Sequence, residues 1–379
     1  MTLNYTATCL FGLEGMLGEE IERLGYKRIH NMDGRITFEG DENACAACNI
    51  ALRYAERLYL HLGSFPANTF TELFDGTKAL PWDEIIGRDD EFPVSGHSIK
   101  SKLFSIPDCQ KIIKKAISAK LGEKYSLTRL PECGTRYKIE FFIFKDTASL
   151  MIDLSGTPLH KRGYRPERVE APIRETLAAA MVKLARPREN VLLWDPFCGS
   201  GTIAIEAAMQ MKNIAPGMKR SFVSEDYPIF PGESWKIFRE KAEDEVIRNT
   251  TFEAYATDID EKCVDIAVAS AKRAGVDDCI TSFQMDALTI GTMGRRGTIV
   301  TNPPYGERLL TPDEADSLYR AMGAAFAALE NWQIYVITQN ERFPELYGKR
   351  ADKVRKLYNG MIPCYYYQYF KNDKRKNHK

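Results

Sequence analysis

Long apolar runs are missing from this sequence, so neither a membrane-spanning segment nor a signal peptide is expected. A surplus of charge of one sign is also missing. The 52 basic residues balance 52 acidic ones, so any affinity for nucleic acid must come from local patches. The nine cysteines stand at scattered spacings, which is not typical of a disulfide framework in a chain of 379 residues. We therefore expect a cytoplasmic protein of two or three domains with no membrane partner.

A glycine-rich stretch at 195–202 lies between an apolar run at 191–193 and a helical pattern at 203–209. A strand, a tight turn and a helix therefore follow one another, which is the βα unit of a nucleotide-type fold. The stretch has neither the G-x-G-x-x-G spacing nor a P-loop lysine, so NAD and ATP are poorly supported. It resembles motif I of class I methyltransferases, which implies S-adenosylmethionine as the cofactor. The residues expected to bind it are Asp195, Pro196, Phe197, Cys198, Gly199, Ser200, Gly201 and Thr202.

Two further carboxylates follow predicted strands, and each suits one part of that cofactor. The strand expected at 252–257 ends at Asp258, where a carboxylate can accept hydrogen bonds from both hydroxyls of a ribose. The strand expected at 279–284 precedes Asp286, which suits a contact with the adenine N6 amine, with a turn-forming aspartate as the alternative. The cofactor-binding residues expected here are Asp258, Ile259, Asp286 and Ala287.

An Asn-Pro-Pro-Tyr turn follows another predicted strand and therefore lies at the carboxyl edge of the sheet. It resembles motif IV of methyltransferases that act on exocyclic amines of planar bases. The side-chain oxygen of Asn302 and the carbonyl of Pro303 can accept the two N–H bonds of such an amine, and Tyr305 can stack on the base. The transfer requires no covalent intermediate and no metal, but the base must leave its stack. As structure alone, the turn is simply a good turn-former. The residues expected to be catalytic are Asn302, Pro303, Pro304 and Tyr305, and Asn302 is also expected beside the cofactor.

Cysteines raise rival chemistries that we consider weaker. Cys45 and Cys48 form a lone C-x-x-C on a predicted helix. A zinc or iron–sulfur site needs further ligands at matched spacing, so two buried packing residues are the better account and no metal is expected. Cys364 has the residue type of a nucleophile, but it lies in the last predicted strand, at 361–367. Cys198 is better explained as a small residue beside the cofactor.

The N-terminal region, up to about residue 165, alternates strand and helix patterns. Strands are expected at 4–10, 35–38 and 57–62, and helices at 14–24 and 42–53. This order suggests a small α+β unit of ferredoxin-like type.

Charge is distributed unevenly in this region. Residues 38–95 hold 11 acidic and 4 basic residues, whereas residues 97–138 hold 10 basic and 3 acidic ones. A helix expected at 107–121 carries several of the lysines off its apolar stripe. A lysine-rich face usually serves solubility, but this concentration beside an acidic block favours a phosphate-binding surface. The lysines expected to bind RNA are Lys100, Lys102, Lys111, Lys114 and Lys115.

Two strings in this region, at 100–110 and 154–165, resemble a THUMP domain, an RNA-binding module of RNA-modifying enzymes. The resemblance also implies a ferredoxin-like partner before it. Arg162 and Arg165, in the second string, are expected either to contact RNA or to clamp two domains together, and the sequence leaves both open.

Together these features predict an α/β fold in which a Rossmann-like methyltransferase domain, with a mostly parallel seven-stranded sheet, follows ferredoxin-like and THUMP domains. The expected domains are 1–63, 64–163 and 164–379, and the irregular segment 211–235 is expected to be an insertion over one face or a lid. The chain resembles bacterial THUMP-containing 23S rRNA guanine-N2 methyltransferases, which implies RNA, most of all 23S rRNA or a ribosome-assembly intermediate, as the partner. The alternatives are a tRNA guanine-N2 methyltransferase, a DNA adenine-N6 methyltransferase and a non-catalytic RNA-binding assembly factor.

Overall fold

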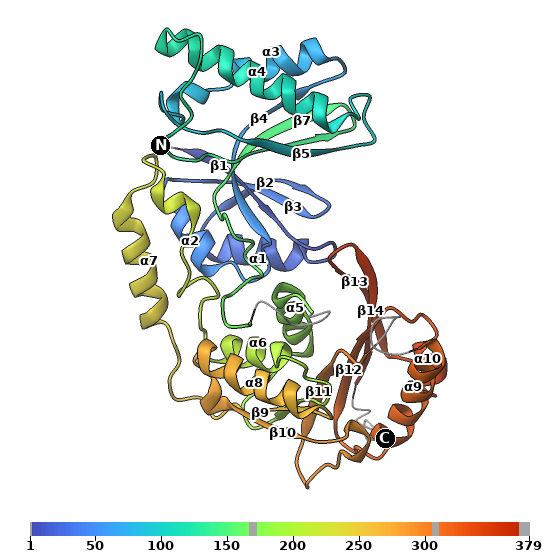
Figure 1. Cartoon of the computed structure of the whole chain (residues 1–379). Coiled ribbons are helices and arrows are strands. Elements are labelled where there is room, and N and C mark those ends of the chain that lie inside the picture. The colour runs from blue at the N-terminus through green and yellow to red at the C-terminus, as the bar shows by residue number, and fades with distance from the viewer. Residues whose placement is uncertain (1, 167–172, 305–310, 371–379) are drawn as a thin grey trace, which may run out of the picture.

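The computed structural model describes residues 2–166, 173–304 and 311–370. Two seven-stranded sheets form its two halves, which Figure 1 shows one above the other. Within the described ranges, no helix is both long and apolar enough to cross a membrane. Tyr305 and the last nine residues lie outside those ranges.

The N-terminal half has one continuous sheet. Its elements are β1 (Leu3–Thr8), α1 (Glu14–Arg23), β2 (Lys27–Met32), β3 (Arg35–Gly40), α2 (Ala44–Ala51), β4 (Arg57–Pro66), α3 (Phe70–Ala79), β5 (Val94–Ile99), α4 (Ile106–Tyr125), β6 (Ile139–Phe144) and β7 (Thr147–Asp153). The strand order is β2-β3-β1-β4-β7-β6-β5. Because β4 pairs with both β1 and β7, it belongs to the ferredoxin-like and the THUMP unit at once. The boundary expected at residue 63 therefore falls inside a strand.

Strand β2 is an element that the sequence pattern did not predict. Four of its six residues are exposed, so it carries no alternation of apolar and polar side chains. It is held instead by backbone pairing to β3, with an irregularity in register between Arg28 and His30.

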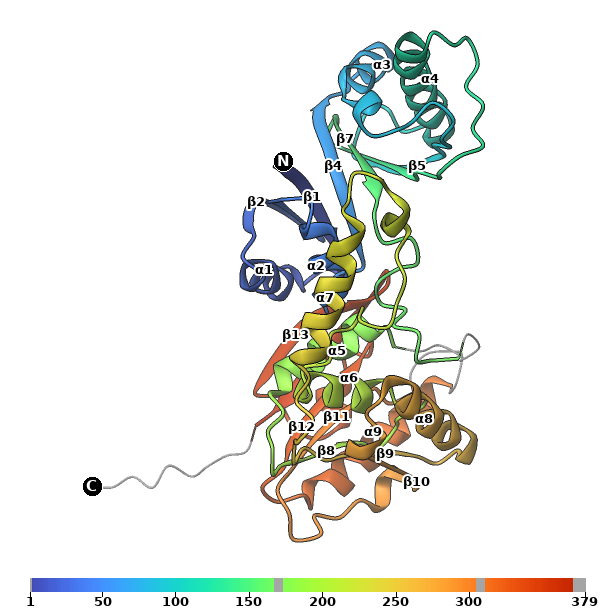
Figure 2. The ribbon, with the colours of Figure 1, turned by 90° about the vertical axis from the view of Figure 1, so that its left-hand side faces the viewer.

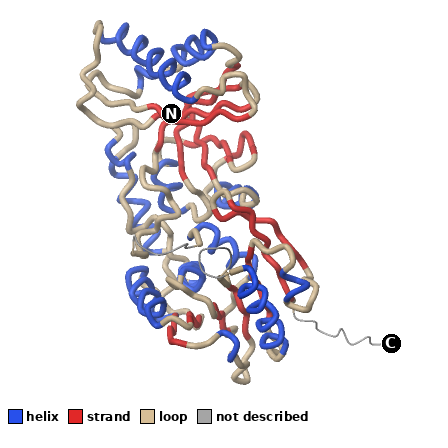
Figure 3. The backbone as a smooth tube through the Cα atoms, turned by 45° about the vertical axis from the view of Figure 1, so that its right-hand side comes forward, coloured by secondary structure: helices blue, strands red, loops and turns tan. Residues whose placement is uncertain are grey.

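The second half contains the Rossmann-like domain. Its elements are α5 (Glu175–Ala185), β8 (Leu192–Asp195), α6 (Thr202–Met211), α7 (Gly232–Asp244), β9 (Ala254–Asp258), α8 (Glu261–Ala274), β10 (Ile280–Gln284), β11 (Gly297–Thr301), α9 (Pro312–Ala327), β12 (Gln333–Thr338), α10 (Phe343–Leu346), β13 (Lys353–Asn359) and β14 (Ile362–Tyr369). The strand order is β10-β9-β8-β11-β12-β14-β13; the first five strands are parallel, and β14 pairs antiparallel with both β12 and β13. Helices flank this sheet on both faces, as Figures 1 and 3 show. The predicted fold class is confirmed.

The segment 211–235 connects the two halves and is not a lid. The backbone N–H of Gly217 donates to the carbonyl of Ile50 at 2.9 Å, and a Cβ at Gly217 would lie 2.3 Å from a carbonyl of α2. Further along, the Ser224 hydroxyl donates to the carbonyl of Leu154 at 2.6 Å. The helix α7 that follows stands beside α2 (Figure 2). The segment is therefore a brace between the catalytic domain and the ferredoxin-like unit.

A buried charged cluster fixes the same junction. Glu206 on α6 is fully buried and lies 3.6 Å from Nη1 of Arg53 and 3.5 Å from Nε of Arg162. The Tyr164 hydroxyl donates to the same carboxylate at 3.1 Å. Each arginine also donates to backbone carbonyls, Arg53 to Ile214 and Arg162 to both Leu159 and Arg53. Three segments of the chain therefore meet on one carboxylate.

These contacts decide between the two expectations for Arg162 and Arg165. The side chain of Arg162 is 1% exposed, so it is not available to an RNA and the prediction of RNA contact there is wrong. Arg165 forms an ion pair with Glu175 at 2.9 Å and donates to the carbonyl of Ile173 and the hydroxyl of Thr202. Both arginines clamp parts of the protein together.

We predict that Glu206→Ala destabilises the protein by about 3–5 kcal/mol, because it leaves two buried guanidinium groups without their counter-charge. Urea unfolding followed by circular dichroism measures this. The matched control is Glu240→Ala on α7, which removes an exposed partner of Lys236 and should change stability little. Equal effects of the two substitutions would contradict the role of the cluster.

Candidate active site

Three neighbouring strands deliver the predicted site residues to one edge of the sheet. In the order β9-β8-β11, these strands are parallel, so their carboxyl ends lie side by side. Asp258 ends β9, Asp195 ends β8, and Asn302 follows β11 directly. Open α/β sheets bind ligands at this edge.

The glycine-rich loop after β8 has the backbone that a close ligand contact needs. Gly199 and Gly201 have φ of +50° and +76°, in the left-handed region that favours glycine. A Cβ at Gly199 would meet nothing within 4 Å, whereas a Cβ at Gly201 would lie 3.0 Å from Cβ of Ala267 on α8. Gly201 is therefore required by packing, and Gly199 faces open space that a cofactor can enter.

Asp258 holds three loops of the site together. Its Oδ2 accepts from the backbone N–H of Gly199 at 2.9 Å, and its Oδ1 accepts from that of Asp260 at 3.1 Å. Its own carbonyl accepts from the N–H of Met285, which begins the next loop, at 2.9 Å. Each carboxylate oxygen keeps a second lone pair, which is what binding two ribose hydroxyls would use.

The residues after β9 and β10 differ in what they offer a ligand. Ile259 is 68% exposed beside Asp258, so its side chain is free to pack against a ligand. Asp286 caps a short 3₁₀ turn, η4 (Ala287–Thr289), by accepting from the N–H of Leu288 at 2.9 Å. This is the turn-forming role that the sequence offered as the alternative for Asp286. Ala287 is buried, so only its backbone is placed to contact a ligand.

Asp195 is used inside the protein. Its Oδ1 accepts from the Thr301 hydroxyl at 2.7 Å and from the N–H of Phe197 at 3.3 Å, which ties β8 to β11. Burial raises the pKa of this carboxyl to about 7. The other side chains of the loop are also engaged internally: Ser200 and Thr202 share a hydrogen bond, and Cys198 is buried.

Asn302 carries the clearest sign of a ligand-binding position. Its side-chain Oδ1 is buried and accepts no hydrogen bond from the described residues. An unsatisfied buried acceptor is costly, so it indicates a donor that arrives with a ligand. Tyr319 fixes the turn that follows Asn302. Its hydroxyl donates to the carbonyl of Pro304 at 3.4 Å and shares a hydrogen bond with the hydroxyl of Thr338. Tyr305, the expected stacking residue, lies outside the described residues.

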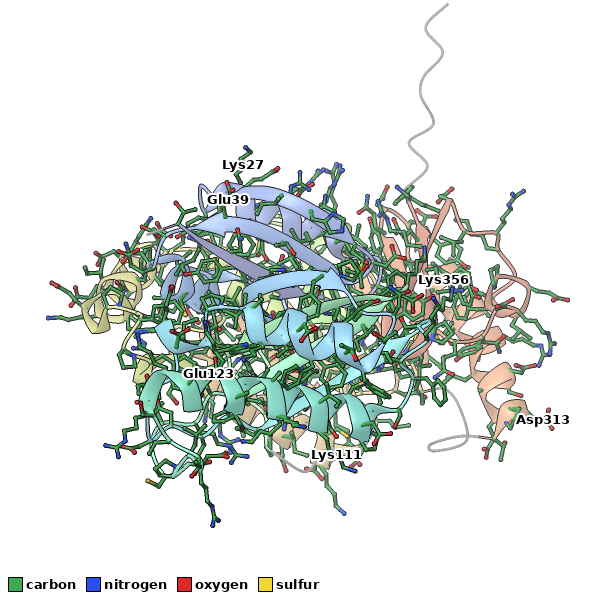
Figure 4. The ribbon with its side chains drawn as sticks, turned by 90° about the horizontal axis from the view of Figure 1, so that it is seen from above. Lys27, Glu39, Lys111, Glu123, Asp313 and Lys356 are labelled. Atoms are coloured by element: carbon green, nitrogen blue, oxygen red, sulfur yellow. The ribbon has the colours of Figure 1, made fainter. Side chains whose placement is uncertain are left out.

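The lysines that were expected to bind RNA differ in how exposed they are. Four of them, Lys100, Lys102, Lys111 and Lys115, are exposed. Lys114 is half-buried: its ammonium pairs with Glu132 and lies 3.7 Å from the centre of the Phe92 ring. Figure 4 shows Lys111 on the outer side of α4. A residue that sequence reasoning missed is Phe104, which is 81% exposed near Lys102; an apolar residue in the sequence gives no sign of such exposure.

The rival cysteine chemistries find no support. Cys45 and Cys48 are fully buried on α2, and burial raises the pKa of the Cys45 thiol to about 12. Cys364 is also buried, within β14. Thiols held in the protonated form are poor nucleophiles and poor metal ligands.

Family models match all three parts of the chain. Residues 162–368, more than half of the chain, match the model described as "RMKL-like, methyltransferase domain". Residues 4–59 match an RlmL ferredoxin-like domain, and residues 67–153 match a THUMP domain. The chain belongs to the RMKL-like methyltransferases. It is therefore an S-adenosylmethionine-dependent methyltransferase, as the glycine-rich loop predicted.

Relatives of this RMKL-like chain include a Bacillus subtilis protein provisionally named RNA methyltransferase YpsC, 45% identical over 96% of this chain and 95% of the relative. The ribosomal RNA large subunit methyltransferase K/L of Psychromonas ingrahamii is 31% identical over 96% of this chain, which spans about half (49%) of that relative.

Solved structures are also similar over the whole chain. SMU.472, complexed with S-adenosylhomocysteine, is 39% identical with a TM-score of 0.90, covering 98% of both chains. A Listeria monocytogenes protein named a predicted N6-adenine-specific DNA methylase is 44% identical with a TM-score of 0.92, covering 98% of this chain and 97% of that one.

We predict that Asp195→Asn stabilises the cofactor-free protein more at high pH than at low pH. Because burial raises the pKa of Asp195 above its ordinary value of 3.8 to about 7, the unfolded chain ionises first. The resulting loss of stability is absent below about pH 4, grows as the pH rises, and is complete above about pH 7. Melting temperatures of both proteins at about pH 5.5 and about pH 8 measure this. A difference that does not change with pH would contradict it.

Proposed function

We propose that this RMKL-like methyltransferase methylates the exocyclic N2 amine of a guanine in 23S rRNA. The observation that carries the proposal is the unsatisfied Oδ1 of Asn302, placed at the carboxyl edge next to the glycine-rich loop. An exocyclic amine has two N–H bonds to donate, which matches an orphaned acceptor next to a backbone carbonyl.

The cofactor residues are assigned on the same geometry. Bound S-adenosylmethionine supplies a methyl group on a positively charged sulfur. We assign the ribose to the carboxylate of Asp258 and the close backbone contact to Gly199, whose Cβ position is open. Ile259, which follows β9, and Asp286, which follows β10 and whose Oδ1 already caps η4, are assigned to the adenine.

The substrate amine is assigned to the turn after β11. Asn302 Oδ1 and the carbonyl of Pro303 accept its two N–H bonds, which directs the nitrogen lone pair away from both acceptors. An aryl amine delocalises its lone pair into the ring, so orientation is the main contribution that these residues make. Stacking of the base on Tyr305 stays a prediction. The target guanine must be flipped out or already single-stranded to reach this edge.

Support for RNA, and for 23S rRNA in particular, comes from outside the catalytic domain. The THUMP match at 67–153 contains the exposed lysines Lys100, Lys102, Lys111 and Lys115. The relatives of K/L type are named for ribosomal RNA of the large subunit, and YpsC is named for RNA. The competing function is adenine-N6 methylation of DNA, which the name of the Listeria relative favours. The THUMP domain decides our preference for RNA.

We predict that two substitutions separate cofactor binding from methyl transfer. Asp258→Ala removes the acceptors assigned to the ribose and should weaken S-adenosylhomocysteine binding at least tenfold, about 1.4 kcal/mol. Asn302→Ala should leave that binding nearly unchanged but lower kcat for methyl transfer by about 100-fold or more. Calorimetry and radiolabelled methyl transfer to deproteinised rRNA measure the two quantities. Normal turnover in Asn302→Ala would refute the assignment of the amine.

We predict that a deletion strain lacks one N2-methylguanosine in its 23S rRNA. Nucleoside mass spectrometry of purified 23S rRNA, tRNA and genomic DNA names the base, the atom and the nucleic acid in one experiment. Restoring the wild-type gene should restore the modification, whereas the Asn302→Ala gene should not. Loss of N6-methyladenine from DNA, or of N2-methylguanosine from tRNA alone, would replace the proposed substrate.

A further inference from the structure

A second basic surface lies in a cleft between the ferredoxin-like unit and the catalytic domain. The cleft has a volume of about 530 Å³, and it is lined by α1 on one side and by α5, β12, β13 and β14 on the other. It includes Gln333, the first residue of β12, and Gln368 of β14. Gln368 pairs with Tyr335 of β12 and therefore lies near the same edge. The cleft is therefore at the amino edge of the parallel sheet, opposite the edge that carries Asn302.

Five cations from two separate parts of the chain converge on this cleft. They are Lys183, Arg186, Arg188, Lys353 and Arg355. All five are exposed, and none forms an ion pair or a side-chain hydrogen bond with the part of the chain that the structure describes. The lining contains one acidic residue, Glu19. Most other arginines and lysines near the domain junction are paired, as Arg53 and Arg162 are, so this unpaired group stands apart.

A buried amide adds an independent observation. Gln368 lines the cleft, is only 3% exposed, and its Nε2 finds no acceptor among the described residues. The NH2 group of the amide is a hydrogen-bond donor, so it can donate to a ligand in the cleft. Phe370 packs edge to face on the buried Tyr335 and is itself 37% exposed, so its ring offers an aromatic surface.

Two structural roles account for part of this charge but not for its convergence. Cations in the last turn of a helix stabilise its dipole, which suits Lys183 on α5. Cations on an edge strand prevent aggregation, which suits Lys353 and Arg355 on β13. The same dipole favours Arg186, the C-cap of α5 at φ +53°, but neither role explains Arg188, which lies beyond the end of the helix. Neither explains the unsatisfied amide.

We propose that this cleft binds the phosphodiester backbone of the RNA substrate. Arginine and lysine side chains free of internal partners, a buried donor and an aromatic surface are the chemistry that recognises an RNA strand. The contact is separate from the THUMP lysines and from the catalytic edge, so it anchors the RNA rather than orienting the target base. This inference rests on the proposed function in one respect, namely that the substrate is RNA.

The first test removes charge from the two parts of the chain that meet in the cleft. Arg186→Gln/Arg355→Gln should raise the Kd about tenfold for a fluorescein-labelled oligouridylate of roughly 20 nucleotides, measured by fluorescence anisotropy. The slope of log K against log salt should fall by about 1.4, or about 0.7 for each lost phosphate contact on a single strand. The control Arg186→Lys/Arg355→Lys keeps the charge and should keep most of the slope. A wild-type Kd and slope in the glutamine variant would overturn the proposal.

The second test adds charge on the opposite wall without touching the cations. Gly15 on α1 lines the cleft, and a Cβ there would meet nothing within 4 Å. Gly15→Glu should weaken binding of the same oligouridylate several-fold by repelling phosphates, whereas the equally large, neutral Gly15→Gln should bind as wild type does. Both are better helix formers than glycine, so folding is not at risk. Equal affinities of the two variants would count against the cleft.

These results are distinguishable from a failure of the proposed function. If mass spectrometry names another base or another RNA, while the glutamine variant loses affinity and slope, the cleft is supported and the proposed target falls. If 23S rRNA carries the expected mark but neither test changes binding, the cleft proposal falls and the function stands.

Discussion

The docking of the N-terminal half of the protein onto the catalytic domain depends on the carboxylate of Glu206. It lies on α6, the helix that begins at the glycine-rich loop, and it meets Arg53 of the ferredoxin-like unit and Arg162 of the segment that joins the domains. A buried carboxylate is tolerated only with such partners, so these three residues must assemble together or not at all. The helix that positions the cofactor loop is therefore the one that docks the N-terminal half. The brace at 211–235 reinforces this junction, which fixes the THUMP unit relative to the catalytic edge.

The catalytic edge depends on a second carboxylate, Asp258. Its carboxylate accepts hydrogen bonds from the backbone N–H groups of Gly199 and Asp260, and its carbonyl accepts one from Met285. These bonds couple the loops after β8, β9 and β10. Asp195 couples β8 to β11 through Thr301 in the same way. The site is thus preorganised by hydrogen bonds among its own loops, and the unsatisfied Oδ1 of Asn302 stands out against that background. Methyl transfer to a weakly nucleophilic amine needs this kind of fixed geometry more than it needs an added acid or base.

The sequence predicted the structure correctly where a pattern within a few residues determines it. Apolar strands that end in Asp195, Asp258 and Asn302 predicted the parallel sheet and its edge, because strand, turn and helix propensities act over a few residues. It did not predict the features that depend on burial against residues distant in the sequence. For Arg162 the sequence left RNA contact and domain clamping both open, because its neighbours Glu206 and Arg53 are distant in sequence. Strand β2 has no apolar pattern, and the cleft at the amino edge joins residues from 12–19, 183–188 and 333–370, which no local motif connects.

A chain with no net charge is an unexpected RNA-binding protein, and the arrangement of its charges resolves this. A few acidic residues, such as Glu206 and Glu175, are buried in ion pairs, and exposed cations gather on α4 and around the cleft. In Figure 1 the helices α3 and α4 of the THUMP unit lie far from α5 and from β12 to β14, which line the cleft. The catalytic edge is the opposite edge of the parallel sheet from the cleft. An RNA that contacts all of them must be large or folded, which suits an rRNA segment better than a short strand. Because counterion release grows with each phosphate contact, affinity for such an RNA rises with the number of patches engaged, and a zero net charge does not oppose it.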